Sequence, residues 1–343
     1  MKILYLAPTD SFSGGENVTL QIAVQMKGRG HKVAYCSPYG SIEDFVCEQG
    51  VPFIGLDRFS LLAVKRAIRA FKPDIVHAMD YRASFYASLL FPDTISHLHN
   101  NCLWLSKLCP NAVALWITAH RAKRCICVSQ SIPDDFCLLN STNKEKFLVL
   151  RNVISPEEVL KKSKSFICER TYDLGFCGRL TKQKDPFTFL EIVMRVKKAI
   201  SNVHAVMIGD GDLRGQVEQM VRDLGLQGNV ELVGFQKNPF PYITACKVMV
   251  MPSLWEGLPM AAIEAMTLGK PLVATPVSGL RDIVTDNCGG LGKTPVVLAE
   301  KVLRCLYASP EVYAHLCHMA RQATQPYTDI DSYVENVEQI YIQ

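Results

Sequence analysis

Short apolar segments alternate along the chain with longer segments whose apolar residues recur at helical spacing. In the first half, the apolar segments that predict strands are Ile3–Ala7, Lys32–Cys36, Pro52–Gly55, Asp74–His77, Thr94–Leu98, Cys125–Val128 and Phe147–Leu150. The segments between them that predict helices are Glu16–Gly28, Ser60–Phe71 and Ala112–Lys123. Buried strands that alternate with helices are typical of βαβ units, which build a parallel sheet.

The same alternation restarts after a polar, lysine-rich segment at 155–170, which we interpret as a linker. The strands predicted after it are Tyr172–Cys177, His204–Gly209, Val230–Val233, Val248–Met251 and Leu272–Ala274, and the helices are Pro186–Ala199, Leu213–Leu224, Pro259–Leu268 and Leu298–Tyr307. The pattern predicts an α/β protein with two Rossmann-like, doubly wound parallel-sheet domains at 1–154 and 171–325. The end of the chain, 326–343, is amphipathic and is expected to pack back toward the first domain. Ligands of such sheets bind at the carboxyl ends of the strands, so a central cleft is the expected site.

Length and composition agree with this organisation. The 343 residues fit two domains at about 100–200 residues each. Hydrophobic residues make up 48% and charged residues 20%, as in soluble globular proteins. The net charge of +4 lies in residues 1–150, with 16 Lys or Arg against 12 Asp or Glu, whereas residues 151–343 hold 21 of each. This excess is too small for nucleic-acid binding but fits an anionic acceptor or a membrane surface.

Cysteine usage and the absence of long apolar segments bear on location. The 13 cysteines show no metal-like spacing, which favours a reducing, cytoplasmic environment. We expect no signal peptide, and no apolar run reaches the roughly 18 residues of a membrane-spanning helix.

The strongest local motif lies at the end of the strand Tyr172–Cys177. Gly178 allows a close turn, and Arg179 and Lys184 stand five residues apart across the loop that follows. Both cations could reach one anion, and cations aimed at a departing diphosphate stabilise the transition state. The alternative is a solvated loop with two surface cations.

A pair of glutamates follows the strand Val248–Met251. Glu256 is expected in the loop and Glu264 two turns into the next helix, with Pro259 in its first turn. The free amides of Met260 and Ala261 would then favour a phosphate, and Glu264 could accept two hydrogen bonds from a ribose diol. The alternative makes Glu256 a carboxylate that stabilises the helix N-terminus.

Glycine turns follow two further strands. Gly209 and Gly211 form a G-x-G after the strand His204–Gly209, a weak signal by itself. Ser13, Gly14 and Gly15 occupy the turn after the first strand, where glycine lets the backbone approach a ligand. Ordinary strand-to-helix turns are the alternative for both.

Two histidines end the fifth predicted strand. His97 and His99 flank Leu98, and we expect their rings to face opposite sides of the strand, so that only one points into the cleft. No further ligands accompany them, so no metal site is expected. The alternative is one core histidine and one surface histidine.

On these motifs the chain resembles the family-4 retaining glycosyltransferases of GT-B fold, which commonly build bacterial capsule, exopolysaccharide and glycolipid. The resemblance covers nearly the whole chain and is densest from Tyr172 to Gly290. Its most specific part combines Gly178-Arg179-Leu180 and Lys184, the I-G-D-G of residues 208–211, and the Glu256–Glu264 pair.

The resemblance implies a role for each matching residue. Arg179 and Lys184 would bind the donor diphosphate, and Glu264 would hold the ribose. Further contacts implied for the donor are Glu256, Leu258, Met260 and Ala261 to sugar and phosphates, Phe235 near the base, His99 near the transferred sugar, and the glycines 14, 15, 178, 209 and 211 in the loops. Two positions depart from the family pattern: Ser13 replaces the first glycine of the usual G-G-x-E, and Asp282 stands where glutamate is usual.

The implied reaction moves a hexose or N-acetylhexosamine from a nucleotide-diphosphate sugar, with UDP favoured over GDP, to a glycan or lipid-linked acceptor. The anomeric configuration would be retained by front-side displacement. Arg179, Lys184 and helix-start amides would replace a divalent metal, so no metal or other cofactor is expected. The alternatives are a nucleotide-sugar epimerase of the same fold and a catalytically idle binding subunit. An NAD dehydrogenase is least favoured, because the dinucleotide fingerprint is missing.

One segment of the first domain raises the question of membrane contact. Phe59–Lys72 carries four cations and apolar residues at helical spacing, a pattern that suits a lipid interface. A crossover helix with a solvated basic side is the alternative. We expect peripheral contact, if any, at the inner face of the cytoplasmic membrane.

Overall fold

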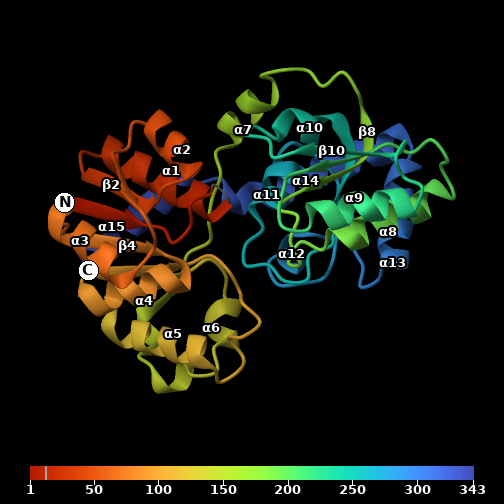
Figure 1. Ribbon diagram of the computed structural model, residues 1–343. Coiled ribbons are helices and arrows are strands. Elements are labelled where there is room, and N and C mark those ends of the chain that lie inside the picture. Colours follow the sequence, from red (N-terminus) through yellow and green to blue (C-terminus); the bar gives the residue numbers. More distant parts are fainter. Residues whose placement is uncertain (12–13) are drawn as a thin grey trace. The chain divides into compact units, whose positions relative to one another are not determined.

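The computed structural model describes residues 1–11 and 14–343 and divides into two compact units. Unit 1 comprises Met1–Val153 together with Ile330–Gln343, and unit 2 comprises Ile154–Asp329. Each unit is a parallel sheet with helices on both faces (Figure 1). The predicted fold class, two Rossmann-like parallel-sheet domains, is therefore confirmed.

The described part of unit 1 contains a seven-stranded parallel sheet with the order β3-β2-β1-β4-β5-β6-β7. Its strands are β1 (Lys2–Leu6), β2 (Lys32–Pro38), β3 (Phe53–Leu56), β4 (Ile75–Met79), β5 (Thr94–Leu98), β6 (Arg124–Cys127) and β7 (Phe147–Val149). Its helices are α1 (Gly14–Gly28), α2 (Ile42–Glu48), α3 (Leu61–Phe71), α4 (Asp80–Leu90), α5 (Pro110–Arg121), α6 (Ser131–Asp135), α15 (Ile330–Ile342) and the short 3-10 turns Leu139–Ser141 and Lys144–Lys146.

Strand β1 shows why this sheet is apolar on both faces. Leu4 and Leu6 point to one face and pack in a cluster with residues of α3 and α4. Tyr5 points to the other face, where its hydroxyl lies 3.4 Å from that of Tyr341 in α15. Because side chains alternate along a strand, burial on both faces requires an unbroken apolar run, which is the pattern seen in the sequence.

The described part of unit 2 contains a six-stranded parallel sheet with the order β10-β9-β8-β11-β12-β13. Its strands are β8 (Tyr172–Cys177), β9 (Ala205–Ile208), β10 (Val230–Gly234), β11 (Cys246–Met251), β12 (Leu272–Ala274) and β13 (Gly289–Leu291). Its helices are α7 (Pro156–Ser163), α8 (Pro186–Lys197), α9 (Arg214–Asp223), α10 (Phe240–Ala245), α11 (Met260–Thr267), α12 (Leu280–Ile283), α13 (Pro295–Leu306), α14 (Pro310–Thr324) and the 3-10 turn Gln325–Tyr327.

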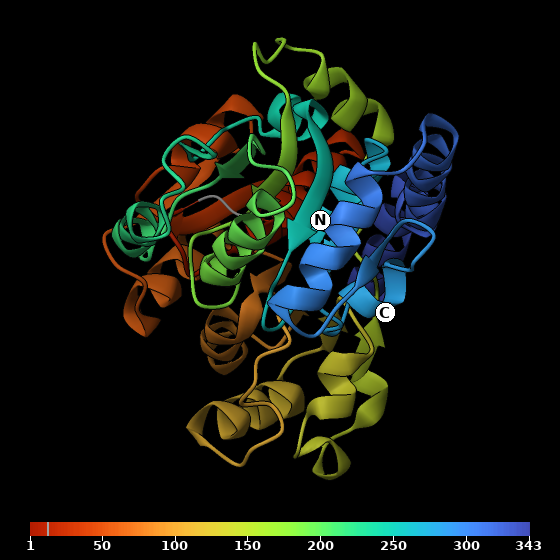
Figure 2. The same cartoon turned by 90° about the vertical axis from the view of Figure 1, so that its right-hand side faces the viewer.

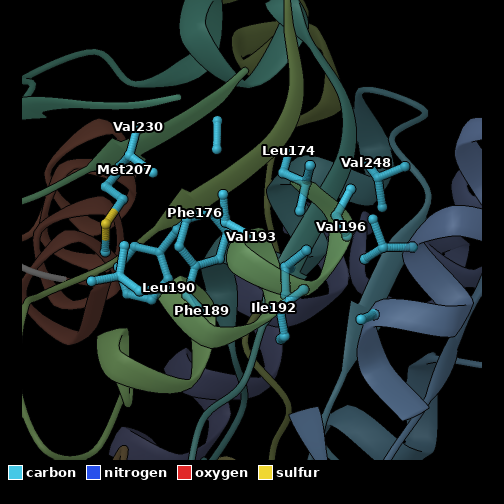
Figure 3. Close-up of a cluster of buried hydrophobic side chains, with 14 of the residues drawn as sticks. Leu174, Phe176, Phe189, Leu190, Ile192, Val193, Val196, Met207, Val230 and Val248 are labelled. Carbon is cyan, nitrogen blue, oxygen red and sulfur yellow. The ribbon is translucent and has the colours of Figure 1, made fainter. Parts of the chain in front are cut away.

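A large apolar cluster joins sheet and helices in unit 2. Leu174 and Phe176 of β8 pack against Phe189 and Val193 of α8, as Figure 3 shows. Helix α13 lies beside α8 (Figure 2) and adds side chains to the same cluster. In Figure 1, α8, α9 and α13 lie below the sheet, and α7 and α10 lie above it. The cluster fixes the strands whose carboxyl ends carry the candidate site.

The segment expected to be a linker is instead part of unit 2. Residues 156–163 form α7, which is capped by the Ser155 side chain and packs against α10 and α11. In the sequence this segment resembles a linker because few of its residues, including Val159, are buried, while its charged side chains face solvent. The boundary between the units therefore lies at Val153 and Ile154.

The point at which the chain returns from unit 2 to unit 1 also differs by a few residues from the expected boundary. Tyr327 stays with unit 2, where its carbonyl accepts a hydrogen bond from the Ile154 amide at 2.8 Å. Helix α15 begins at Ile330 and lies in unit 1. The sequence interpretation also missed α4, because that helix buries small residues such as Ala83 and Ala87 and so lacks an apolar stripe.

The basic segment Phe59–Lys72 is the crossover helix α3 between β3 and β4. Its apolar stripe, Val64, Ala67 and Ile68, is buried in the cluster of unit 1. The basic side, the exposed Leu61 and Leu62, and Ala70 face outward. Among residues 1–11 and 14–343, no helix combines the length and hydrophobicity needed to cross a bilayer.

Candidate functional site

Three loops at the carboxyl ends of the unit 2 strands are joined by backbone hydrogen bonds. The Gly178 amide after β8 donates to the Ile208 carbonyl of β9 at 3.0 Å. The Leu180 amide donates to the Asp210 carbonyl at 2.9 Å, and the Leu254 amide after β11 donates to the Gln183 carbonyl at 2.8 Å. The motifs identified in the sequence around residues 178–184, 209–211 and 256 therefore share one edge of the sheet.

Glycine is required where the first two loops touch. A Cβ atom on Gly209, whose φ is 135°, would lie 2.1 Å from the Gly178 carbonyl oxygen. A Cβ atom on Gly211 would lie 2.6 Å from the Leu180 carbonyl oxygen. No side chain can occupy either space, so these glycines allow the β9 loop to approach the β8 loop.

Lys184 and Glu256 form a short ion pair across the site. Lys184 Nζ donates to Glu256 Oε1 at 2.6 Å, and the side chains are only 16% and 5% exposed. The loop that carries Glu256 is held by the Gln183 side-chain amide, which donates to the Trp255 carbonyl at 3.0 Å. A buried pair of this kind places one cation and one carboxylate at a fixed position, and each would be costly to leave alone.

Arg179 lies in the same loop as Lys184 but has a different environment. Its side chain is exposed. Across the described residues, its guanidinium makes no hydrogen bond or ion pair. One of the two predicted cations is thus paired with Glu256, and the other is available to an anion.

Helix α11 begins at Met260, directly after Pro259, which is the N-cap rather than a residue of the first turn. The amides of Ala262 and Ile263 donate to the Pro259 carbonyl, so those of Met260 and Ala261 belong to the unpaired first turn. The Leu258 and Met260 side chains are buried. The arrangement agrees with amides that face a phosphate at the start of a helix.

Glu264 is half-buried on the same helix, and burial raises the pKa of its carboxyl to about 7, against a smaller opposing effect of Lys162. Its carboxylate makes no hydrogen bond or ion pair within the part of the chain that the structure describes. Such a group is suited to a ligand that donates hydrogen bonds, such as a diol. Phe235, predicted near the base, follows β10 and is exposed.

The candidate residues of unit 1 meet at the start of α1 and the end of β5. Gly14 and Gly15 are the first residues of α1. A Cβ atom on Gly15 would lie 3.6 Å from His99 Cγ, so the glycine backbone lies against this ring. Ser13 of the same motif lies outside the described residues.

The expectation that His97 and His99 face opposite sides is wrong. Residues two apart share a face of an extended chain, and the two rings lie with centroids 4.1 Å apart, both buried. His77 extends the group, since its Nε2 lies 3.0 Å from His97 Nδ1. Burial lowers the pKa of His99 to about 4, that of His77 to about 3 and that of His97 well below its usual range. All three rings are therefore neutral at pH 7.

Asp80 is a residue of this site that the sequence interpretation missed. Its Oδ1 accepts the His99 backbone amide at 2.9 Å, and its Oδ2 accepts the Asn100 side-chain amide at 3.0 Å. Asp80 directly follows β4 with φ of 58°, a left-handed conformation that aspartate tolerates. A polar residue at a strand end was the available signal, the same one that singled out His99.

Among the described residues, no group of three or more His, Cys, Asp or Glu side chains could hold a metal ion. The functional groups of the candidate site are cations, the amides at the start of a helix, one carboxylate that can accept hydrogen bonds, and neutral imidazoles. Fixed donors and cations of this kind stabilise charge that develops on an oxyanion or a departing phosphate.

Two family profiles match most of the chain. Glycosyltransferase Family 4 matches residues 12–158, and Glycosyl transferases group 1 matches residues 159–321. The chain belongs to the group 1 glycosyltransferases of family 4, and its fold is GT-B.

Similar proteins are found among sequences and solved structures. An uncharacterized glycosyltransferase of Methanocaldococcus jannaschii, MJ1059, is 36% identical over 37% of this chain and 32% of its own length. The UDP-Gal:alpha-D-GlcNAc-diphosphoundecaprenol alpha-1,3-galactosyltransferase of Escherichia coli is 23% identical over 68% of this chain and 66% of its own length. The chain thus matches between a third and two thirds of the length of these relatives.

The crystal structure of Anabaena Alr3699/HepE in complex with UDP and glucose superposes with a TM-score of 0.85 at 19% identity, covering 99% of this chain and 98% of the other. WaaG, a glycosyltransferase involved in lipopolysaccharide biosynthesis, superposes with a TM-score of 0.79 at 18% identity, covering 99% of both chains. At this identity the likeness shows the shared GT-B fold.

Proposed function

We propose that the protein is a retaining glycosyltransferase that moves a hexose or N-acetylhexosamine from a nucleotide-diphosphate sugar to a glycan or lipid-linked acceptor in cell-surface polysaccharide biosynthesis. The observation that carries the proposal is the loop edge of unit 2. There the buried Lys184–Glu256 pair lies beside loops whose close approach requires glycine. Arg179 and the Glu264 carboxylate, on the same edge, make no side-chain hydrogen bond or ion pair within residues 1–11 and 14–343.

The donor is proposed to be a UDP-sugar rather than a GDP-sugar. A diphosphate suits Arg179, Lys184 and the first amides of α11, and the ribose diol suits Glu264. The UDP in the HepE complex and the UDP-galactose named for the E. coli relative support the choice of nucleotide. His99, beside Gly15 in unit 1, is the proposed contact to the transferred sugar.

The acceptor is proposed to be a glycan on a lipid diphosphate. Two relatives carry names with such an acceptor, the E. coli enzyme and a Campylobacter jejuni N-acetylgalactosaminyltransferase that is 28% identical over 44% of this chain. The outward cations of α3 would favour an anionic bilayer surface, and the 13 unpaired cysteines support the cytoplasmic side. Because the apolar stripe of α3 is buried in its own unit, contact would be electrostatic, with Leu61 and Leu62 as the large apolar side chains that this helix could add.

The proposed mechanism is front-side displacement with retention. As the bond to the anomeric carbon breaks, charge grows on the leaving diphosphate, where Arg179 and Lys184 would stabilise it. The same diphosphate would take the proton of the attacking acceptor hydroxyl. Lys184 is already paired with Glu256, so its ammonium group would stay in place through the reaction and would not have to move toward the diphosphate. No metal or other cofactor is part of this proposal.

A thermal-shift panel tests the donor site. We expect UDP, and not GDP, ADP or NAD, to stabilise the wild-type protein by about 2.7 kcal/mol at 100 times its dissociation constant. Arg179→Ala should lose most of this gain because it removes the free cation. Arg222→Ala, an exposed arginine in the last turn of α9, is the matched control and should keep it. The proposal would be contradicted if NAD stabilised the protein, or if none of the nucleotides did.

A further inference from the structure

His99 has one ring nitrogen with a neighbour and one without. Its Nδ1 lies 3.4 Å from the side-chain amide nitrogen of Asn152. Its Nε2 is buried and, among the described residues, has no hydrogen-bond partner. A buried imidazole nitrogen without a partner is costly, and an oxygen of a bound ligand would complete it.

Asn152 is in turn held by the C-terminal helix of the chain. The Tyr333 hydroxyl of α15 donates to Asn152 Oδ1 at 3.3 Å, and both side chains are buried. In the part of the chain that the structure describes, the Tyr333 hydroxyl has no other hydrogen bond. A path of hydrogen bonds thus runs from α15, through Asn152, to the ring of His99. Helix α15 begins more than 170 positions after Asn152 in the sequence.

The direction of the hydrogen bond between Tyr333 and Asn152 decides the direction of the hydrogen bond between Asn152 and His99. If the Asn152 amide were turned around, its nitrogen would face the Tyr333 oxygen, and the phenolic hydrogen would be buried without an acceptor. With the hydroxyl donating to Oδ1, the amide nitrogen of Asn152 must donate to His99 Nδ1. A neutral imidazole that accepts at Nδ1 carries its proton on Nε2.

We infer that Tyr333 and Asn152 are positioning residues that hold His99 in the tautomer with its proton on Nε2, so that this buried N–H is offered to an acceptor oxygen of the bound sugar. The part that concerns the sugar rests on the proposed function. The tautomer itself does not, since it follows from contacts within unit 1. The low pKa of His99 agrees with it, because a ring that is neutral at pH 7 must choose one of its two tautomers.

The neighbouring histidines form a separate hydrogen-bond path that provides a matched control, although the His97 ring lies against that of His99. The Tyr341 hydroxyl, also on α15, lies 2.7 Å from His77 Nδ1, and His77 contacts His97 rather than His99. Tyr341→Phe and Tyr333→Phe therefore each remove one buried hydroxyl from the same helix, but only the second breaks the path to His99.

The test is a long-range proton–nitrogen NMR spectrum of the full chain labelled with 15N-histidine at pH 7.5. The signals of His99 are identified by their loss in His99→Gln. We expect the wild type to show the Nε2–H tautomer and Tyr333→Phe to shift His99 toward a mixture of both tautomers. In Tyr341→Phe, His99 should keep the Nε2–H tautomer and the signals of His77 should move. An Nδ1–H tautomer in the wild type, or unchanged His99 signals in Tyr333→Phe, overturns the inference.

Kinetics separate the failure of this inference from that of the proposed function. With a UDP-sugar donor, Tyr333→Phe should lower kcat by about fivefold, the effect of weakening one hydrogen bond, with little change in KM. Full activity in Tyr333→Phe would overturn the link to the sugar. If the spectra behave as expected but no nucleotide binds to the wild type, the tautomer assignment stands and the proposed function fails.

Discussion

The raised pKa of Glu264 leads to a quantitative prediction about stability. Burial raises the pKa from 4.5 to about 7 in the folded protein. At 1.36 kcal/mol per pK unit, the ionised form is about 3 kcal/mol less favourable in the folded state than in the unfolded chain. Between pH 4.5 and about 7 the folded protein keeps a proton that the unfolded chain has lost. The stability contributed by this group therefore falls as the pH rises through that range and stays low above it.

The perturbation is Glu264→Gln, which removes the titration while keeping size and shape. In calorimetric unfolding between pH 5 and pH 8, the variant should gain stability relative to the wild type by up to about 3 kcal/mol as the pH rises. Both proteins share all other titrating groups, so the difference between them isolates Glu264. A difference that stays constant from pH 5 to pH 8 would refute the argument that burial controls this carboxyl.

The same carboxyl should couple nucleotide binding to a proton. A ribose diol that donates hydrogen bonds favours the ionised form, so UDP should release a proton from Glu264 near pH 6.5. Relative to Glu264→Gln, the affinity of the wild type would then fall by up to tenfold for each pH unit below about 7. Calorimetric titration in two buffers of different ionisation enthalpy measures the release. UDP titrates in this range too, but equally with both proteins, so equal release by both would refute the contact.

Three further predictions follow from the loop edge and from the surface of unit 1. Lys184→Ala leaves the 5% exposed Glu256 without its cation and should destabilise unit 2 by about 3 kcal/mol, and adding Glu256→Gln should restore most of it in thermal unfolding. Gly209→Ala should lower the free energy of unfolding by about 2 kcal/mol or more and weaken UDP binding, because its Cβ would meet the Gly178 oxygen. The control Gly215→Ala, which has open space around it in α9, should leave stability unchanged or raise it. Unchanged stability in Gly209→Ala would contradict the close approach of the two loops. Turnover by purified enzyme should survive EDTA, and loss of activity that Mg²⁺ or Mn²⁺ restores would show that the cations of the site do not suffice.

Much of the fold could be predicted because local patterns carry it. Strands buried on both faces need unbroken apolar runs, and crossover helices between them need a stripe, as at α3 and α8. Two of the helices that the sequence analysis did not assign lie where burial does not leave such a pattern. Helix α4 buries alanines and serines, and α7 exposes most of its charged surface, so neither contrasts with its surroundings in the sequence.

The candidate site shows the same division. Gly209, Arg179, Lys184 and the glutamates were identifiable because each lies in the loop or helix that follows a strand, and parallel strands bring their carboxyl ends to one edge. Which of these groups touch is a different matter. The pairing of Lys184 with Glu256 joins residues 72 positions apart, whereas the Arg179 side chain has no partner among the residues that the structure describes.

The sequence by itself therefore determined the two parallel-sheet domains, the strand ends that bear chemistry and the family of the protein, since these depend on short-range periodicity and on motifs read in order. Only the tertiary structure decided the state of each group. The burial that raises the pKa of Glu264, the stacking of His97 on His99, and the contact of Tyr333 with Asn152 all depend on neighbours from distant segments. Electrostatics and hydrogen bonding act over a few ångströms of space, and distance along the chain says little about which side chains come that close.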